Sequence, residues 1–315
     1  MKLTEDLAKR LLREEGLPVP EGVATDTARD AGRVAAEFGG VIAVKALVAA
    51  GRRGKSGLVS LVEGSDAAES AAAGMLGRNT PAGHVARVYI EKGAEISSEL
   101  YLAFSFDDRT PMLTLSCDGG VEIEDVHRNT PERIVTVAID PLAGLRSWEA
   151  IEHWSRAGLT GRPLAEVGRL TARLWRAFVA LDAIMLEVNP LALDSNGRAM
   201  LVGAMLEVDD DAVDRHPELA GAPERMPDNP RERAVQDTNR ANPGGDARYV
   251  ELDGNIGLLV AGGGAGLLQH DLIVDLGGHP ANHSDISPSP GTVKMEAVLD
   301  AVFTNPRARS LLIGY

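Results

Sequence analysis

Apolar and polar positions recur along this chain at two different intervals, one typical of helices and one typical of strands. Near the beginning, Leu7, Leu11 and Leu12 follow helical spacing after Thr4, and Gly16 ends the run. Thr is a residue type that commonly caps helices, and Gly commonly follows their last turn. The pattern therefore predicts a first helix that Thr4 caps.

Short apolar runs rich in β-branched residues predict strands. The run 40–48 holds one lysine, Lys45, among apolar residues, and a glycine-containing turn at 51–57 leads into a returning strand. Further strands are expected at 84–94, 99–106, on both sides of Asp118-Gly119-Gly120, and in a hairpin over 184–206 that turns at Asp194-Ser195-Asn196-Gly197. Asn-Gly in that turn is a strong hairpin signal.

Helices are expected between these strands and again towards the end of the chain. Helical patterns lie at 65–73, 147–157 and 163–181, and five prolines within 215–250 indicate a linker-like connection. After it, the pattern predicts a strand at 255–260, a glycine-rich turn at 262–266, a helix at 267–278 and a strand at 309–315. Strand–helix alternation predicts a doubly wound parallel sheet, left unfinished where the chain stops on a strand.

Composition narrows the class of protein. The 315 residues include 46 acidic and 32 basic side chains, giving a net charge of −14, so a general nucleic-acid binder is not expected. Cys117 is the one cysteine, which excludes an internal disulfide and any zinc site built from several cysteines. The first residues are charged and resemble neither a signal peptide nor a membrane segment. We expect a cytoplasmic protein with no membrane partner.

Lys45 and the basic turn that follows it suit an anionic ligand. A lysine in an apolar strand beside a glycine-containing loop with further cations could neutralise the phosphates of a triphosphate, although the spacing of a Walker A loop is missing. The alternative is a strand-edge lysine next to a solvated turn. Glu91 and Glu99 are candidate acceptors for adenine or ribose groups, or else ordinary exposed glutamates.

Glu187 and Asn189 stand two residues apart on a predicted strand, so both point to one face. A carboxylate and an amide oxygen are suitable ligands for Mg²⁺ bridging nucleotide phosphates. The alternative is that this face of the strand is simply exposed to solvent. If Lys45 and this pair converge on one pocket, the pocket suits a purine triphosphate.

Other candidates are weaker. The glycine loop 261–266 could place a helix N-terminus on an anion, or could simply allow close packing of strand and helix. His279 and His283 are four apart but follow two glycines, so a solvated loop is expected rather than a metal site. Cys117 has no basic neighbour in sequence and is not expected to be a nucleophile.

Together these segments resemble the β subunit of succinyl-CoA synthetase and related nucleotide-dependent carboxylate–CoA ligases. The matching stretches follow the family order over the whole chain: LTEDLAKRLLREEGLPVP, VKALVAAGRRGKSG, ISSELYLAFSFDDRTP, GGVEIEDV, AIDPLAG, LEVNPLAL, YVELDGNIGLLV and LGGHPANHSDI. The resemblance implies an α/β protein: an α+β ATP-grasp domain over 1–235, with a subdomain inserted at about 22–95, and an incomplete flavodoxin-like domain over 236–315.

The resemblance also implies roles for particular residues and partners. It assigns nucleotide binding to Lys45, Arg52, Arg53, Gly54, Glu91, Ala94 and Glu99, a magnesium ligand to Asn189, and a catalytic position facing a phosphohistidine to Glu187. ATP or GTP would be the substrate and Mg²⁺ the cofactor. A partner α-type subunit would bind CoA and carry the histidine that passes phosphate to a small carboxylate.

Departures from the family pattern lie at the metal and acyl-substrate end. Gly203 stands where a second magnesium ligand, an aspartate, is expected, and Ala261 stands where an asparagine contacts substrate. Two interpretations follow: a ligase with a remodelled acyl site, or an impaired subunit that binds nucleotide or acts as a scaffold. A standalone ATP-grasp carboxylate–amine ligase is a third. If the metal site is the defect, Gly203→Asp should raise phosphorylation of the partner.

Overall fold

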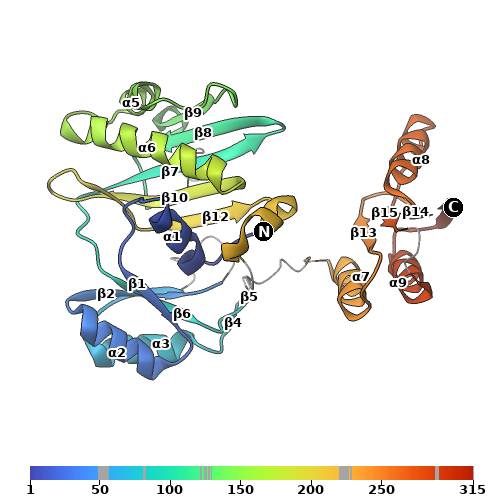
Figure 1. Ribbon diagram of the computed structural model, residues 1–315, viewed down its shortest axis with the longest axis horizontal. Helices are drawn as coiled ribbons and strands as arrows, with labels where there is room; N and C mark the ends of the chain where they lie inside the picture. The colour runs from blue at the N-terminus through green and yellow to red at the C-terminus, as the bar shows by residue number, and fades with distance from the viewer. Residues whose placement is uncertain are drawn as a thin grey trace. The chain divides into compact units, whose positions relative to one another are not determined.

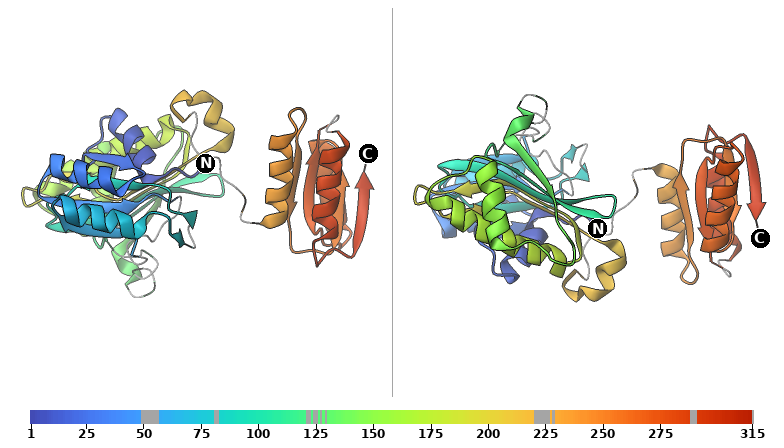
Figure 2. Two further views of the ribbon diagram at one scale, coloured as in Figure 1. Left: turned by 90° about the horizontal axis from the view of Figure 1, so that it is seen from below. Right: turned by 90° about the horizontal axis from the view of Figure 1, so that it is seen from above.

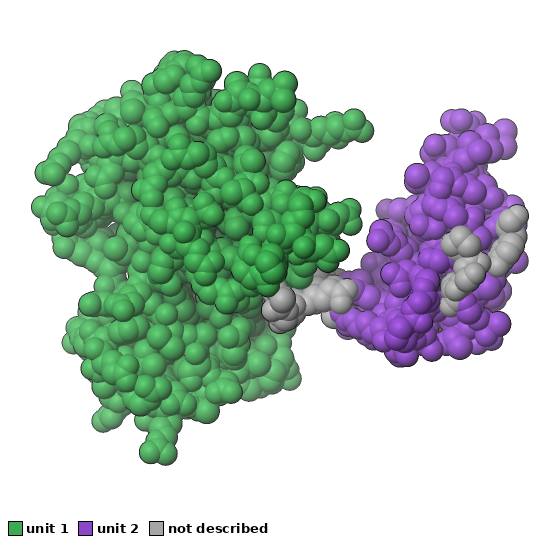
Figure 3. All heavy atoms as spheres, viewed as in Figure 1, with its two compact units in different colours: residues 1–223 green, residues 224–315 purple. Residues whose placement is uncertain are grey.

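The computed structural model describes residues 1–48, 57–80, 83–120, 123, 126, 128, 130–219, 227, 229–287 and 291–314. The chain divides into two compact units, Met1–Pro223 and Glu224–Tyr315 (Figure 3). This division falls before the boundary expected at 235/236, which lies inside helix α7 (Pro230–Ala241). Within the described residues, no helix combines the length and the apolar composition that crossing a membrane requires.

A four-stranded antiparallel sheet forms the smaller layer of the first unit. Its strands lie in the order β1 (Gly22–Thr25), β6 (Val88–Lys92), β2 (Val41–Ala46) and β3 (Val59–Glu63). Helices α2 (Ala28–Phe38) and α3 (Ser65–Met75) cover one face, where apolar residues such as Ile42, Val44 and Ile90 are buried. Alternation along β2 and β6 sends Lys45 and Glu91 to the opposite face.

A second antiparallel sheet carries most of the core of this unit. Its order is β11 (Ala199–Leu201), β10 (Ala183–Leu193), β7 (Ser98–Asp107), β8 (Thr110–Ser116) and β9 (Ile134–Ala138), and β12 (Ala204–Val208) also pairs with β10. Helices α5 (Ser147–Arg156) and α6 (Arg162–Ala180) cover one face (Figure 1). Leu102, Phe104 and Leu186 belong to the same buried cluster as Trp154 and Phe178 of these helices.

Helix α1 (Glu5–Glu14) lies between the two sheets (Figure 1). The stripe that begins with Leu7 packs against the core of the larger sheet, and the backbone N–H of Leu3 donates to Leu206 of β12. Thr4 occupies the N-cap position, but its side chain makes no capping hydrogen bond, so the expected cap is wrong. Its hydroxyl is buried and faces the interior without a partner.

The second unit holds two two-stranded sheets side by side, with helices on both faces. Strands β13 (Ala247–Glu251) and β15 (Asn282–Ile286) pair antiparallel, whereas β14 (Ile256–Val260) and β16 (Ser310–Gly314) pair parallel. Helix α8 (Gly263–Asp275) lies on one side of the strands, and α7 and α9 (Thr292–Phe303) lie on the other (Figure 1), with β16 at the edge (Figure 2). The strand directions are therefore mixed, not wholly parallel as the alternation predicts.

Between β15 and β14, side chains replace part of the backbone ladder. The backbones meet at both ends, where Ala281 N–H donates to Ile256 and Gly262 N–H donates to Ile286. In the middle, Asn282 exchanges two hydrogen bonds of 2.9 Å with the backbone of Leu258, and Ser284 donates to the same Leu258 carbonyl at 2.8 Å. Asn282 and Ser284 are fully buried.

Several expected elements differ from the structure. The described residues of 121–129, namely Ile123, Val126 and Arg128, are helical, so the second strand expected after Asp118-Gly119-Gly120 is wrong, and β8 pairs with β9 instead. Ile123 and Val126 are three apart, which is a helical interval. The short elements complete the first unit: β4 (Asn79–Thr80), β5 (Gly83–His84) and the 3₁₀ turns Pro131–Arg133, Asp210–Arg215 and Pro217–Leu219.

The linker expected over 215–250 contains helix α7 and strand β13. Asn229 caps α7 by accepting from the N–H of Arg231 at 2.9 Å, and Pro230 occupies the first turn. A proline in that turn leaves no intrahelical bond unmade, so it begins a helix instead of interrupting one. The expected glycine loop 262–266 is also shorter than predicted, because α8 begins at Gly263.

Candidate functional site

One face of the larger sheet carries the polar pair predicted on β10. Glu187 pairs in register with Ala103 of β7, and Tyr101, two residues earlier on β7, donates from its hydroxyl to Glu187 Oε2 at 3.3 Å. Asn189 Oδ1 accepts from the N–H of Gly120 at 2.8 Å. Both side chains of the pair therefore lie on the face away from α5 and α6, as their two-residue spacing predicts.

Gly120 brings Glu99 to the same face. The carboxylate of Glu99 lies so close to Gly120 that a Cβ at Gly120 would stand 1.7 Å from Glu99 Oε2, and Gly120 also has φ of +70°. A residue with a side chain would be strained at this position and would collide with Glu99. The glycine thus allows Glu99 and Asn189 to approach one another across the end of β8.

On the smaller sheet, Lys45 belongs to a buried group of four charged residues that we call the buried charge cluster: Glu5, Lys9, Lys45 and Glu91. Lys45 Nζ is 2.9 Å from Glu5 Oε1 and 2.7 Å from Glu91 Oε1. Lys9 Nζ is 2.9 Å from Glu5 Oε1 and forms a second ion pair with Glu91 Oε2. All four residues are at most 5% exposed, and their formal charges cancel.

The two lysines of this cluster titrate differently. Burial alone lowers the pKa of Lys45, but the charges of Glu5 and Glu91 outweigh burial and raise this pKa above its usual value. Burial is the largest influence on Lys9, and together with the charge of Lys45 it lowers the pKa of Lys9. The surroundings therefore favour the protonated form of Lys45 more strongly than that of Lys9.

The lysine strand and the hairpin meet at Val202. Lys45 Nζ donates to the carbonyl oxygen of Val202 at 2.8 Å, and Lys9 Nζ donates to the same oxygen at 2.6 Å. The next residue, Gly203, accepts from the N–H of Asn189 at 3.0 Å. The lysine strand and the hairpin therefore meet at Val202, and the Lys45 ammonium is surrounded by the carboxylates of Glu5 and Glu91 and shielded from solvent.

Glu5 and Lys9 are absent from the sequence-based candidates. A signal for them exists: they stand at i and i+4 on α1, on the same stripe as the buried Ala8 and Leu12. Opposite charges inside an apolar helical stripe indicate burial as a pair. Tyr101 is also missed, and no pattern in the sequence singles it out. Gly120 is expected in a turn, but not as a residue that positions Glu99 and Asn189.

The magnesium ligands implied by the family do not fit the described residues. Asn189 offers one amide oxygen, which already accepts from Gly120. At Gly203 an added Cβ would stand 1.9 Å from the Asn189 carbonyl oxygen, so the backbone leaves no room for a ligand side chain. Among the residues that the structure describes, no group of three His, Cys, Asp or Glu side chains is placed to bind a metal.

The remaining predicted site residues belong to both units of the chain. Arg52, Arg53 and Gly54 lie outside the described residues. Ala94 is half-buried just after β6. Ala261 belongs to the second unit, where its N–H donates to Gly314 of β16 at 3.2 Å.

The surroundings of three weaker candidates show what role each plays. His283 lies within strand β15, so the solvated loop expected around it is wrong. A Cβ at Gly266 would stand 3.2 Å from the Ser284 carbonyl oxygen, which favours close packing of α8 on β15 as the role of this glycine. Burial, followed by the charge of Asp118, raises the pKa of the Cys117 thiol, which opposes a thiolate nucleophile.

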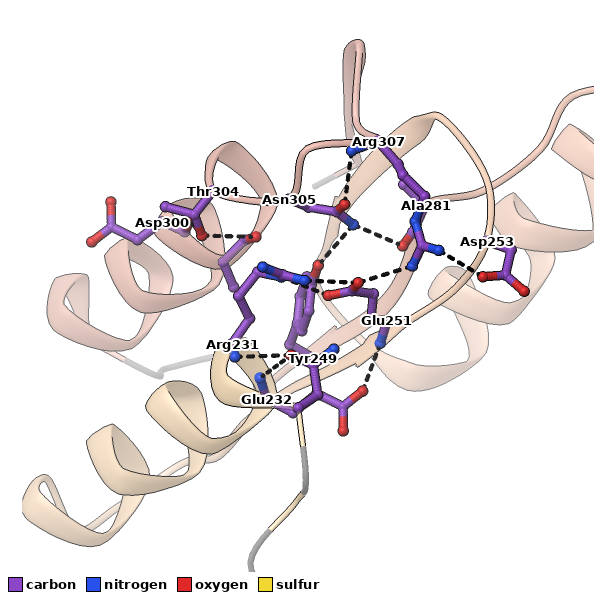
Figure 4. Close-up of polar contacts among 12 residues, drawn as sticks. Arg231, Glu232, Tyr249, Glu251, Asp253, Ala281, Asp300, Thr304, Asn305 and Arg307 are labelled. Carbon is purple, nitrogen blue, oxygen red and sulfur yellow. Dashed lines mark hydrogen bonds and ion pairs between the residues drawn. The ribbon is translucent and has the colours of Figure 1, made fainter.

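The second unit contains a separate polar cluster at the beginning of α7 (Figure 4). Arg231 binds both carboxylate oxygens of Glu251, at 2.6 and 2.8 Å, and Arg307 binds Glu251 at 2.9 Å and Asp253 at 2.8 Å. The Glu251 N–H donates to Glu232 at 2.9 Å. Each guanidinium faces a carboxylate, so this cluster joins α7, β13 and the segment after α9 as a structural clamp.

Comparison with known proteins finds relatives that match the chain over both units. The family model described as the ATP-grasp domain matches residues 2–193. The β subunit of ADP-forming succinate–CoA ligase from Rubrobacter xylanophilus is 36% identical over 318 residues, covering 100% of this chain and 81% of that protein. The corresponding subunit from an Acidovorax species is 35% identical over 324 residues, covering 100% and 82%.

Solved structures show the same fold. ATP citrate lyase from Methanothrix soehngenii, in complex with citrate and coenzyme A, superposes with a TM-score of 0.62 at 22% identity. The match covers 100% of this chain and 80% of that one. At this level of identity the likeness concerns the fold alone.

Proposed function

The chain belongs to the family of succinate–CoA ligase β subunits, with an ATP-grasp domain in its N-terminal part, and from this premise we propose that it is the nucleotide-binding subunit of a carboxylate–CoA ligase. ATP or GTP is the phosphoryl donor, and an α-type subunit that binds CoA is the partner. The acyl site accepts a small carboxylate and is remodelled around Ala261. The cytoplasmic location expected from the sequence is part of the same proposal.

The convergence of the lysine strand and the hairpin supports this proposal most strongly. Lys45 comes from the smaller sheet and Asn189 from the larger one, yet both make hydrogen bonds to the adjacent residues Val202 and Gly203. Nucleotide phosphates need a protonated cation, and the charges around Lys45 keep its pKa high. Glu99 lies on the same face as Asn189, where a base or ribose would find an acceptor.

Glu187 is the proposed catalytic residue. In the proposed reaction an imidazole nitrogen of the partner's histidine attacks the γ-phosphorus, and the bond to the β,γ-bridging oxygen breaks to release ADP. The phosphoryl group then passes to a carboxylate oxygen, and the CoA thiol displaces phosphate. Glu187 accepts the opposite N–H of that imidazole, which orients the ring. The Tyr101 hydroxyl, 3.3 Å away, fixes the carboxylate.

One observation favours a second candidate function. The crowded backbone at Gly203 excludes the second metal ligand of the family, so the chain could bind nucleotide without transferring phosphate. In that case the protein is a nucleotide-binding or scaffold subunit within the heteromer.

The test is to incubate the chain, co-expressed with an α-type subunit, with γ-³²P-ATP and Mg²⁺, and to measure acid-labile label on the α chain. A ligase subunit gives label on an α histidine, and Glu187→Gln removes that label while ATP binding persists. Glu37→Gln, on the exposed face of α2, is the matched control and keeps the label. A stable heteromer that binds ATP but is never labelled would overturn the ligase proposal in favour of the scaffold.

A further inference from the structure

The buried charge cluster pairs each of its carboxylates twice. Glu5 Oε1 is 2.9 Å from both Lys9 Nζ and Lys45 Nζ, and Glu91 binds Lys45 through Oε1 and Lys9 through Oε2. The carbonyl oxygen of Val202 also accepts from both lysines. If either lysine left, both carboxylates and this carbonyl would keep a partner.

The two lysines differ in how readily each could leave the buried charge cluster. The side chain of Lys9 is fully buried, on the face of α1 that also carries Leu12, and its ammonium lies 5.8 Å from the centre of the Tyr89 ring. The side chain of Lys45 is 7% exposed and is the most exposed of the four. Lys45 is therefore the exchangeable member, and Lys9 is the fixed one.

We propose that Lys9 is a positioning residue: it is the counter-ion that allows Lys45 to exchange its carboxylates for the phosphates of a nucleotide. A carboxylate left alone in a buried site is strongly unfavourable, so Lys45 could not leave Glu5 and Glu91 without a second cation. This inference rests on the proposed nucleotide-binding function, and it adds a residue outside the set that the sequence singles out.

The first test compares ATP with adenosine, which carries the purine and ribose but no phosphate. Binding is measured by isothermal titration calorimetry for Lys9→Met, Lys9→Arg and Arg10→Met, the last being an exposed basic residue on the same helix. Lys9→Met is expected to weaken ATP binding at least tenfold and adenosine binding less than twofold, and Lys9→Arg to recover most of the loss. Arg10→Met is expected to bind both ligands as the unmodified protein does. Equal losses for both ligands in Lys9→Met would indicate a general structural defect and would overturn the inference.

A second variant covers the case in which Lys9→Met fails to fold. Glu5→Gln/Lys9→Met removes one carboxylate and one lysine, so the cluster stays neutral but Glu91 depends on Lys45 alone. We expect this variant to keep its circular dichroism spectrum and still bind ATP at least tenfold more weakly. ATP affinity equal to that of the unmodified protein in the folded double variant would overturn the role of Lys9.

Lys45→Met separates this inference from the proposed function. Because Lys9 still pairs with both carboxylates, the variant should fold, and it should lose ATP binding if Lys45 contacts phosphate. Unchanged ATP binding in Lys45→Met would contradict the proposed role of Lys45 itself. Loss of binding in Lys45→Met together with unchanged binding in Lys9→Met would contradict only the counter-ion role.

Discussion

Gly203 and Asn189 face each other across the β10–β12 hairpin with no space between them. The N–H of Asn189 donates to the Gly203 carbonyl at 3.0 Å, and a Cβ on Gly203 would stand 1.9 Å from the Asn189 carbonyl oxygen. The atoms in conflict are backbone atoms, which cannot turn aside as a flexible side chain could. The hairpin therefore depends on glycine at 203.

We expect Gly203→Asp to destabilise the first unit and not to restore phosphorylation, contrary to the expectation drawn from the sequence. Gly203→Ala should already cost about 2–4 kcal/mol, because the backbone must move to admit the Cβ. Urea unfolding followed by circular dichroism measures this cost. The control is Gly74→Ala in α3, where nothing lies within 4 Å, and it should be stabilising by about 0.5–1 kcal/mol. A stable Gly203→Asp variant with increased labelling would contradict the assigned geometry.

Tyr101→Phe should slow phosphoryl transfer without affecting ATP binding. The hydroxyl donates to the Glu187 carboxylate, so its loss removes one contact that orients this carboxylate, and we expect roughly a tenfold lower rate of histidine labelling. Glu187→Gln should lower the rate about a hundredfold or more. Rapid-quench measurement of the labelled partner gives both rates. An equal loss of ATP affinity in Tyr101→Phe would indicate that Tyr101 supports the nucleotide pocket instead.

His216 should make the first unit more stable in mild acid than in mild base. Burial alone lowers its pKa, but hydrogen bonds from its ring to Asp182 and Glu218, both 2.9 Å, outweigh burial and raise it. A raised folded-state pKa gives stability that is complete below the unfolded value of about 6.5 and is lost as the pH rises through the folded value. His216→Gln should remove this part of the pH dependence, as measured by urea unfolding between pH 6 and pH 9.

His153 provides a control of opposite sign. Burial, followed by the charge of Arg156, lowers the pKa of His153, so the folded state takes up its proton less readily than the unfolded state. Its contribution to stability therefore increases as the pH rises through the window just below 6.5. His153→Gln should flatten the pH profile there, and the same change in slope for both histidine variants would contradict the assigned shifts.

Thr171→Val should destabilise the larger layer of the first unit by about 1–3 kcal/mol. The fully buried Trp154 donates from its indole N–H to Thr171 Oγ1 at 2.8 Å, and valine keeps the shape but removes this acceptor. Thermal unfolding should show a shift of roughly 2–4 °C per kcal/mol. Thr136→Val, on an exposed position of β9, is the matched control and should change stability by less than about 0.5 kcal/mol.

Glu251→Gln should weaken the second unit alone. The carboxylate lies between Arg231 and Arg307, and the hydrogen bond from Arg231 is the largest influence that lowers its pKa. Losing this charge should cost about 2–3 kcal/mol. Hydrogen exchange resolved by segment should show faster exchange in α7, β13 and the segment after α9. Faster exchange in the first unit would contradict the assignment of the clamp to the second unit.

The periodic patterns of the sequence were sufficient for elements that bury one face. The apolar stripes of α5 and α6, the alternation of β7 and the hairpin around Asn196-Gly197 all lie where predicted. The family motifs also identified the ATP-grasp domain that the comparisons confirm. These predictions are correct because local spacing alone decides which side of an element is apolar.

Features that depend on distant contacts could not be predicted in the same way. The burial of Lys45 depends on α1 packing so that Glu5 lies beside it. Because the two residues are 40 positions apart, local spacing in the sequence does not show this contact. The crowding at Gly203 depends on how the hairpin twists past Asn189. The glycine pair before Ile123 and Val126 predicts a simple reversal into a second strand, whereas both residues are helical in the structure.

The hydrogen bonds that Asn282 and Ser284 make to Leu258 have a consequence for how this part of the chain can vary. An ordinary ladder tolerates almost any side chain, since every residue brings the same peptide group to it. Between β14 and β15, the side chains of Asn282 and Ser284 make these hydrogen bonds in place of peptide groups. An isosteric change such as Asn282→Leu would therefore leave the amide of Leu258 without a hydrogen bond between the strands. Part of the strand pairing in the second unit therefore depends on which residues stand at positions 282 and 284. Substitutions at these two positions are more restricted than at positions where only backbone groups pair the strands.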